Sequence, residues 1–339
     1  MKKENPLAIV ILAAGKGTRM KSELAKVLHP VFGRPMIQHV LASTAGLPSD
    51  KRIIIIGHQR HAVREALADD ACTFVVQEEQ LGTAHAVLTA KEAIADDCED
   101  VMILCGDTPL ISGQSLEEMY DRHRTNSATV TLMTTQLGDP TNYGRIISDN
   151  AGNLLRIVEE KDADPAEKRI KEINAGIYCV RRDFLYRALQ KVENNNSQGE
   201  LYLTDIIDLA VKSEQKVQRY LAPEPKDVLG VNSRIELAMA DEELRMRRNR
   251  EVMLTGVSMI LPATIMISSQ SEIGFDSLVG AGVELRGHCQ IGSNCKIDTG
   301  AILTNCKMES GSHVGAYSVL TGCTVAADEK IPAQQREEE

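Results

Sequence analysis

The chain has 339 residues, of which 43% are hydrophobic and 25% are charged, as in globular proteins with a substantial core. This length suits two domains better than one. The formal net charge of −10 and the aromatic content of 3% argue against a nucleic-acid partner, because such proteins need a basic surface and stacking rings. Single nucleotides are compatible with this composition.

The N-terminal region predicts a first strand rather than a targeting segment. The apolar run 7–14 is short, lacks a small-residue cleavage site and leads directly into a basic, glycine-rich loop. No stretch approaches the roughly 18 apolar residues that a membrane helix needs. The eight cysteines form no C-x-x-C pair, which favours reduced thiols over disulfides or zinc sites. These features predict a cytoplasmic protein without a membrane partner.

Apolar strands alternate with helix-length segments from about residue 7 to residue 230. After the first strand, the predicted strands are 53–56, 73–76, 101–104, 128–133 and 176–180. This rhythm predicts an α/β fold with a Rossmann-like, mainly parallel sheet and helices on both faces. Ligands of such sheets bind beyond the carboxyl ends of the strands. Gly15 and Asp107 both follow predicted strands and are therefore expected at that edge.

The loop Gly15-Lys16-Gly17-Thr18-Arg19-Met20 has the composition of a phosphate-binding loop. Its glycines allow backbone N–H groups to approach an anion, and Arg19 and Lys26 can add charge-assisted hydrogen bonds. The spacing fits neither a P-loop nor the G-x-G-x-x-G fingerprint of dinucleotide-binding folds. An ordinary strand-to-helix turn is the alternative interpretation of the same residues.

Asp107 follows the predicted strand 101–104 through Cys105 and Gly106, and it precedes Pro109. An exposed carboxylate at the sheet edge with no neighbouring basic residue suits Mg²⁺, a hard ion that shares oxygen ligands with substrate phosphates. An Asx turn before Pro109 explains the same residue equally well.

Other polar segments have the composition of recognition loops. Segment 77–85 carries Gln77 and Gly82, whose amide and backbone groups can recognise the edge of a base. Segments 142–145, 158–161 and 172–176 supply the carboxylates and amides that hydrogen-bond sugar hydroxyls. Each segment taken alone is also explained as a solvated loop.

A repeat with a period of six follows a predicted linking helix. Its aliphatic positions are Ile267, Ile273, Val279, Leu285, Ile291 and Ile297 and, after one omitted residue, Ile302, Met308, Val314 and Leu320. Small residues stand four positions later, at Ser271, Ser277, Val283, Cys289, Cys295, Ala301, Cys306, Ser312, Ser318 and Thr324. Hexapeptides of this kind build a parallel β-helix, and these ten predict a little over three coils. The cysteines of the series are predicted to pack inside rather than to bind metal.

The motifs of the first part, taken in chain order, resemble those of one enzyme family. They are LAAGKGTRM (12–20), KVLH (26–29), QLGTAH (80–85), GDTPL (106–110), YGRI (143–146), EEKDA (159–163), EINAGIY (172–178), QGELYLTD (198–205) and GVNSR (230–234). They resemble the uridyltransferase half of the bifunctional N-acetylglucosamine-1-phosphate uridyltransferase/glucosamine-1-phosphate acetyltransferase family, which makes the cell wall precursor UDP-N-acetylglucosamine. The resemblance extends into the linking helix and a left-handed β-helix.

The resemblance implies Mg²⁺-dependent transfer of a uridylyl group from UTP to N-acetylglucosamine 1-phosphate, with pyrophosphate leaving and no covalent enzyme intermediate. It implies that Arg19 and Lys26 are catalytic residues that neutralise phosphates, and that Asp107 and Asn232 hold Mg²⁺. The substrate-binding residues that it implies are Leu12, Ala13, Gly15, Gly17, Gln77, Gln80, Gly82, Thr83, Gly144, Glu159, Asn174, Tyr202, Thr204 and Asn232. Of these, Gln77 and Gly82 would contact uracil, and Gly144, Glu159, Asn174 and Thr204 would line the sugar site. Positioning and charge neutralisation dominate such phosphoryl chemistry, so the residues present agree with it.

The predicted segments are a nucleotidyltransferase domain (1–232), a linking helix (233–256), a β-helix (257–326) and an acidic tail that we expect to be disordered (327–339). The β-helix is shorter than in the bifunctional members, whose later coils bear the CoA site and a catalytic histidine. We therefore expect no acetyltransferase activity. A short β-helix also favours self-association, and the resemblance favours a trimer among homo-oligomers.

Two alternatives to the implied activity stay open. Ala175 replaces the Thr that the family usually has after Asn174, which leaves room for a thymidylyl- or uridylyltransferase that acts on glucose 1-phosphate. A non-catalytic sensor that binds a sugar nucleotide is the second alternative. The joint presence of the four phosphate- and metal-binding residues argues against the sensor.

Overall fold

The computed structural model describes residues 7–49, 51–95 and 97–338, and the chain divides into two compact units. The first unit takes in the residues up to 237 except 31–33, and the second takes in 31–33 and the residues from 238 onward. Helix α7 (Arg234–Leu254), which corresponds to the predicted linking helix, begins in the first unit and ends in the second.

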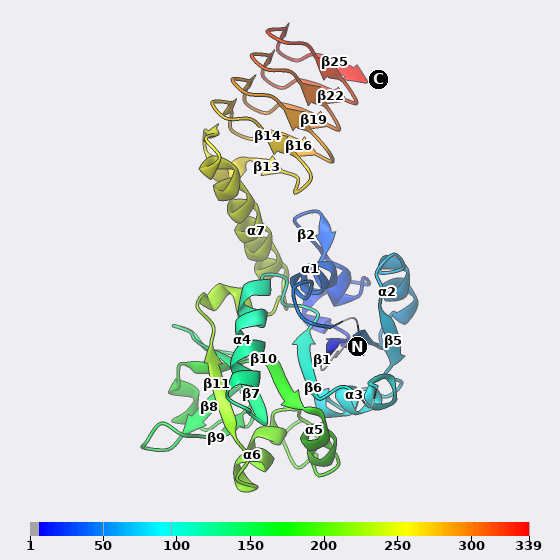
Figure 1. Cartoon of the computed structure of the whole chain (residues 1–339), viewed down its shortest axis with the longest axis vertical. Coiled ribbons are helices and arrows are strands. Elements are labelled where there is room, and N and C mark those ends of the chain that lie inside the picture. The colour runs from blue at the N-terminus through cyan, green and yellow to red at the C-terminus, as the bar shows by residue number, and fades with distance from the viewer. Residues whose placement is uncertain (1–6, 50, 96, 339) are drawn as a thin grey trace. The chain divides into compact units, whose positions relative to one another are not determined.

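A nine-stranded sheet forms the middle of the first unit (Figure 1). Its main path runs in the order β11-β7-β10-β6-β1-β4-β5, and β8 and β9 form an antiparallel pair attached to β10. The strands are β1 (Leu7–Ala13), β4 (Arg52–Ile56), β5 (Thr73–Val76), β6 (Asp100–Cys105), β7 (Val130–Gln136), β8 (Arg145–Ser148), β9 (Leu154–Val158), β10 (Glu172–Arg181) and β11 (Val217–Leu221). Every predicted strand is present.

Four neighbouring pairs on the main path are parallel, which confirms the predicted Rossmann-like, mainly parallel sheet. Strand β10 is the exception, because it runs antiparallel to both β6 and β7. Its register places Tyr178 opposite Ile103 and Arg181 opposite Asp100. The first residues of β10 therefore lie near the carboxyl end of β6.

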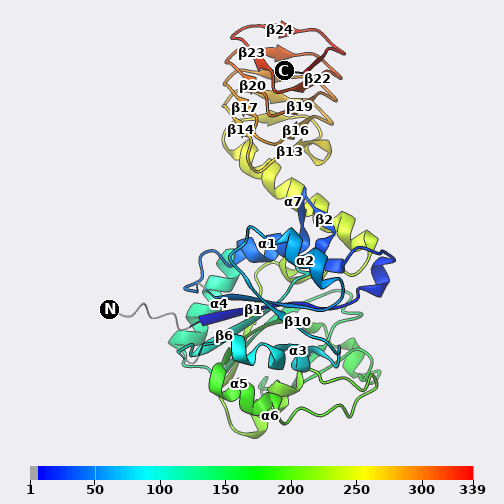
Figure 2. The ribbon, with the colours of Figure 1, turned by 90° about the vertical axis from the view of Figure 1, so that its right-hand side faces the viewer.

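Helices cover both faces of this sheet (Figure 2). Apolar side chains of α1 (Met36–Ser43), α2 (Arg60–Ala66) and α4 (Gly113–Thr125) share one core with Leu7, Ile9 and Ile11 of β1. Those of α3 (Thr83–Thr89), α5 (Arg182–Leu189) and α6 (Asp205–Lys212) share the other core with Ala8 and Val10. Successive side chains of a strand point to opposite faces, so β1 is apolar throughout because both of its faces are buried.

Short elements complete the part of the chain before α7. They are the two-residue strands β2 (Pro30–Val31) and β3 (Arg34–Pro35) and the 3₁₀ turns Thr18–Met20, Lys26–Leu28, Lys91–Ala93, Glu167–Arg169 and Pro225–Val228. Another such turn, Pro262–Thr264, lies in the second unit. No helix within the described ranges is long and apolar enough to cross a membrane.

The second unit is a parallel β-helix of very short strands. Its three parallel sheets have the orders β12-β15-β18-β21-β24, β13-β16-β19-β22-β25 and β14-β17-β20-β23. The strands are β12 (Ser258–Met259), β13 (Met266–Ile267), β14 (Glu272–Ile273), β15 (Leu278–Val279), β16 (Glu284–Arg286), β17 (Gln290–Ile291), β18 (Lys296–Ile297), β19 (Ile302–Thr304), β20 (Lys307–Met308), β21 (His313–Val314), β22 (Val319–Thr321), β23 (Thr324–Val325), β24 (Lys330–Ile331) and β25 (Arg336–Glu338). The described coils thus outnumber the predicted ones.

Most predicted inward positions of the repeat are buried, but two predictions were wrong by one residue. Leu303 is fully buried where Ile302 had been predicted, so the five-residue step falls between Leu303 and Met308. Cys323 is buried where Thr324 had been predicted. In both places two adjacent residues suit the interior, and the strand register decides between them.

Buried serines connect successive coils of the β-helix. The Ser271 hydroxyl donates to the carbonyl of Gly287 at 3.0 Å and accepts from the N–H of Cys289 at 3.1 Å. These bonds satisfy backbone groups that strand pairing leaves unpaired at the corners. The cysteines of the repeat are buried free thiols, which confirms that they pack in the interior.

The acidic tail differs from its prediction. Strands β24 and β25 lie within 327–339 and pair with β21 and β22. Ile331 continues the inward aliphatic series with 9% of its surface exposed. Residues 327–338 therefore extend the β-helix, because strand pairing outweighs the polar composition of this segment, while Glu339 lies outside the described residues.

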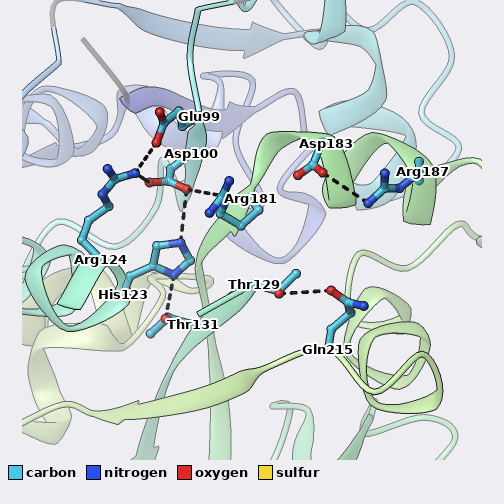
Figure 3. Close-up of polar contacts among 10 residues, drawn as sticks. All are labelled: Glu99, Asp100, His123, Arg124, Thr129, Thr131, Arg181, Asp183, Arg187 and Gln215. Carbon is cyan, nitrogen blue, oxygen red and sulfur yellow. Dashed lines mark hydrogen bonds and ion pairs between the residues drawn. The ribbon is translucent and has the colours of Figure 1, made fainter. Parts of the chain in front are cut away.

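A buried carboxylate lies at the N-terminal end of β6 (Figure 3). Asp100 is fully buried, accepts a hydrogen bond from Arg124 at 2.9 Å and lies 3.7 Å from the Arg181 guanidinium. His123 contacts Asp100 at 3.3 Å and, through its other ring nitrogen, Thr131 at 2.8 Å. Burial would raise the pKa of Asp100, but the hydrogen bonds with His123 and Arg124 outweigh it and hold the pKa below its ordinary value.

We expect Asp100→Asn to lower the free energy of unfolding by about 3 kcal/mol, because it removes the charge that its cationic partners face. The control is Asp183→Asn, which breaks an exposed pair with Arg187 (Figure 3) and should cost about 0.5 kcal/mol or less. Urea unfolding followed by circular dichroism measures both, and equal costs would contradict the importance of the buried network.

The same network predicts a pH dependence. Because the folded-state pKa of Asp100 is lowered, its contribution to stability is complete above the ordinary value of 3.8 and is lost as the pH falls through the folded-state value. The stability difference between wild type and Asp100→Asn should therefore shrink in acid. If the stability difference between the two proteins grew as the pH fell, the lowered folded-state pKa of Asp100 would be refuted.

Candidate active site

A cavity of about 380 Å³ lies at the carboxyl edge of the sheet in the first unit. Its walls come mainly from the segments that follow β1, β5 and β6. The predicted site residues that line it are Leu12, Ala13, Gly15, Gly17, Lys26, Gln77, Gln80, Gly82, Thr83 and Asp107. These residues were predicted from separate sequence motifs, and they line one cavity.

Two glycines of this cavity occupy positions that other residues do not fit. Gly17 has φ of +58°, and a Cβ there would lie 2.5 Å from the Cβ of Lys26. Gly82 has φ of +120°, and a Cβ there would lie 2.4 Å from the carbonyl oxygen of Leu201. The first loop therefore packs directly against Lys26. A Cβ on Gly15 would meet no atom within 4 Å, so the loop is open on that side.

Lys26 joins the two predicted metal ligands. Its ammonium forms an ion pair with Asp107 and donates to Oδ1 of Asn232 at 2.6 Å. Arg19 donates to the same oxygen of Asn232 at 2.8 Å. The expectation that Asp107 has no basic neighbour was wrong, because Lys26 is remote in sequence but is brought close by the adjacent strands β1 and β6.

The start of α7 fixes the orientation of Asn232. The Glu236 carboxylate accepts from the N–H of Asn232 at 2.7 Å and from the Ser233 hydroxyl at 3.0 Å, while that hydroxyl accepts from the N–H of Glu236 at 3.2 Å. Ser233 thus caps the N–H of Glu236 as in a capping box, while the Glu236 carboxylate binds the N–H of Asn232, one residue before the cap. Nδ2 of Asn232 donates to the carbonyl of Gly230 at 3.1 Å, so Oδ1 faces the two cationic side chains.

Asp107 and Asn232 form a donor set that fits Mg²⁺. Their oxygen atoms converge on one cationic group, the Lys26 ammonium. Mg²⁺ is typically held by one or two carboxylates together with water and substrate phosphates. Within the described part of the chain, no group of three or more His, Cys, Asp or Glu side chains could hold a metal. The protein would therefore supply only part of a coordination shell.

The residues predicted to recognise the base also hold the loop in place. Gln77 is 4% exposed, and its Nε2 donates to the carbonyl of Gly82 at 3.1 Å and lies 3.1 Å from a ring nitrogen of His85. Gln80 donates to the carbonyl of Ala14 at 2.8 Å. The loop after β5 is thereby tied to the glycine-rich loop after β1.

The predicted sugar ligands form a second group outside this cavity. The Thr204 hydroxyl donates to Glu159 at 3.2 Å, and the N–H of Asn174 donates to the carbonyl of Gly144 at 2.9 Å. A Cβ on Gly144 would lie 3.5 Å from both carboxylate oxygens of Glu159. Burial raises the pKa of Glu159, and the Thr204 hydrogen bond opposes that shift. Together with Tyr202, Glu159 and Thr204 also line a further cavity of about 520 Å³.

The first cavity is also lined by residues that were not predicted as site residues, namely Ala14, Lys16, Val27, Ala86, Cys105 and Glu200, although Lys16 belongs to the predicted phosphate-binding loop. The thiol of Cys105 contacts the carbonyl of Gly176 at 3.5 Å, and burial together with the charge of Asp107 raises the pKa of that thiol to about 12. Its place at the end of an apolar strand was a signal that could have identified it. The S-x-x-E spacing at 233–236 was a similar signal for Glu236.

Comparison with known proteins shows the family to which this chain belongs. A model described as nucleotidyl transferase matches residues 8–243. The bifunctional protein GlmU of Pelobacter propionicus is 42% identical over 325 residues, which are 95% of this chain and 70% of that protein. GlmU of Geotalea uraniireducens is 42% identical over 328 residues, 96% and 72% of the two chains, and GlmU of Listeria monocytogenes serotype 4a is 44% identical over 311 residues, 92% and 68%. The chain therefore belongs to the GlmU family and is a nucleotidyltransferase.

Proposed function

We propose that this nucleotidyltransferase moves a uridylyl group from UTP to N-acetylglucosamine 1-phosphate in the presence of Mg²⁺, giving UDP-N-acetylglucosamine and pyrophosphate. The observation that carries the proposal is the convergence of Lys26, Arg19, Asp107 and Asn232 beside a cavity that the glycine-rich loop also lines. The likeness to GlmU proteins supports the choice of substrates.

In this reaction an oxygen of the sugar phosphate attacks the α-phosphorus of UTP, and the bond to pyrophosphate breaks. Arg19 and Lys26 place two positive charges where negative charge spreads over the phosphoryl oxygens. The backbone at Gly15 and Gly17 offers N–H groups to the phosphates. Asp107 and Asn232 would hold Mg²⁺, which when bound neutralises phosphate charge. No protein nucleophile is needed.

We assign recognition of uracil to Gln77 and Gly82, and recognition of the sugar to Gly144, Glu159, Asn174 and Thr204. The buried carboxylate and amide can accept and donate hydrogen bonds to sugar hydroxyls. The remaining predicted substrate ligands are Leu12, Ala13, Gln80, Thr83 and Tyr202, which lie in the same two groups of residues.

Two further expectations stay predictions. One is self-association, with a trimer favoured. The other is the absence of acetyl transfer: the repeat's histidines, His288 and His313, contact Gln270 at 3.0 Å and Asp298 at 2.8 Å, and we assign neither a role in that chemistry.

Pyrophosphate release with Mg²⁺ tests the proposed substrates. UTP and TTP are each paired with N-acetylglucosamine 1-phosphate and with glucose 1-phosphate, because Ala175 beside Asn174 leaves the sugar choice open. We expect release to be confined to UTP with N-acetylglucosamine 1-phosphate. Preference for another pair would replace the substrates but keep the reaction, and silence in all four would favour a sugar-nucleotide sensor.

Asp107→Ala should lower turnover by about two orders of magnitude or more, the scale expected for loss of a central electrostatic group. The fold should persist, because the side chain is partly exposed at the cavity. Glu78→Ala is the matched control, since it removes a carboxylate from an exposed pair with Arg60 and should leave turnover unchanged. Near-normal turnover of Asp107→Ala over a range of Mg²⁺ concentrations would refute the metal assignment.

A further inference from the structure

Strand β10 is irregular beside the proposed sugar ligands. Asn174 pairs with Thr134 of β7, whereas Tyr178 pairs with Leu132, so four steps along β10 match two steps along β7. Gly176 lies in the middle with φ of +74°, and a Cβ there would approach the thiol of Cys105 to 3.1 Å. The segment is a bulge that glycine makes possible.

The bulge brings together two side chains that a regular strand would separate. In an extended strand, residues four positions apart lie about 13 Å apart. Here Nδ2 of Asn174 donates to the Tyr178 hydroxyl at 2.7 Å, and Oδ1 of Asn174 accepts from the N–H of Gly176 at 3.1 Å. The Asn174 amide is therefore held at both ends by its own strand.

The Tyr178 hydroxyl lies in the interior of the protein, where it can hold the Asn174 amide in one orientation. The side chain is only 2% exposed. Burial raises the pKa of Tyr178, and the nearby Glu159 raises it further, so the hydroxyl stays neutral at physiological pH. It thus offers a fixed acceptor to Asn174 without adding charge to the site.

We propose that Tyr178 is a positioning residue of the sugar-phosphate site, whose buried hydroxyl holds the Asn174 amide in the orientation that the substrate meets. With one N–H given to Tyr178 and one lone pair taken by Gly176, the amide keeps one donor and one acceptor site for a sugar group. Because the Asn174 amide is already oriented, binding of the sugar phosphate carries no further entropic cost for ordering this side chain. The inference rests on the proposed function, which makes Asn174 a sugar ligand.

The test is steady-state kinetics of the full chain carrying Tyr178→Phe. Loss of one hydrogen bond to the amide should raise KM for N-acetylglucosamine 1-phosphate by about tenfold. The KM for UTP and kcat should change by less than about twofold, because uniform binding of one substrate is lost. Tyr186→Phe is the matched control: Tyr186 is a buried tyrosine of α5 whose hydroxyl has no hydrogen-bond partner among the described residues.

A double-mutant cycle separates positioning from a general structural role. Once Asn174→Ala has removed the amide, adding Tyr178→Phe should leave the KM for the sugar phosphate unchanged. An effect of Tyr178→Phe that persists in that background, or that raises both KM values together with a lower unfolding midpoint, would overturn the inference.

The outcomes also separate this inference from the proposed function. A wild-type chain that releases no pyrophosphate from UTP with either sugar phosphate refutes the proposed function and the inference with it. An active wild-type chain whose Tyr178→Phe variant has the wild-type KM for the sugar phosphate refutes the inference alone.

Discussion

The contacts of the Lys26 ammonium hold together parts of the site that are far apart in the sequence. Lys26 pairs with Asp107 after β6 and donates to Asn232 before α7, while Gly17 packs against its side chain. The ammonium and the carboxylate are only 16% and 20% exposed, so neither would be well solvated without the other. The glycine-rich loop, the Asp107 turn and the start of α7 therefore depend on one another.

Local charge rather than total charge decides what this site can bind. The chain carries a formal net charge of −10, which disfavours anions at long range. Salt screens exposed charges beyond roughly 8 Å under physiological conditions. Arg19 and Lys26 meet at a single oxygen of Asn232, and the Asp107 carboxylate offsets part of the Lys26 charge. On the proposed function, a phosphate at this edge therefore meets cationic groups at close range although the whole chain is negative.

The sequence predicted features that depend on local pattern and missed those that depend on register. Every strand predicted from an apolar run between loops is present, because a strand that is buried on both faces consists mostly of apolar residues. Periodicity could not choose between the adjacent Ile302 and Leu303, and pairing with Leu285 and Leu320 places Leu303 inside. The sequence also did not reveal the contact between Lys26 and Asp107. The two residues follow strands β1 and β6, which are neighbours in the sheet but far apart along the chain.

The antiparallel direction of β10 brings a second set of polar residues to the sheet edge. A parallel strand presents there only the residues that follow its carboxyl end, such as Gly106 and Asp107 after β6. Because β10 runs the other way, with Tyr178 opposite Ile103, its early residues lie beyond that same end. Asn174 therefore belongs to the strand itself and is held by the pairing of β10 with β7. The bulge at Gly176 turns the Asn174 amide toward Tyr178. A ligand on a strand keeps its geometry better than one on a free loop. On the proposed function, in which Asn174 binds the sugar, this reversal lets one sheet edge serve both the nucleotide and the sugar phosphate.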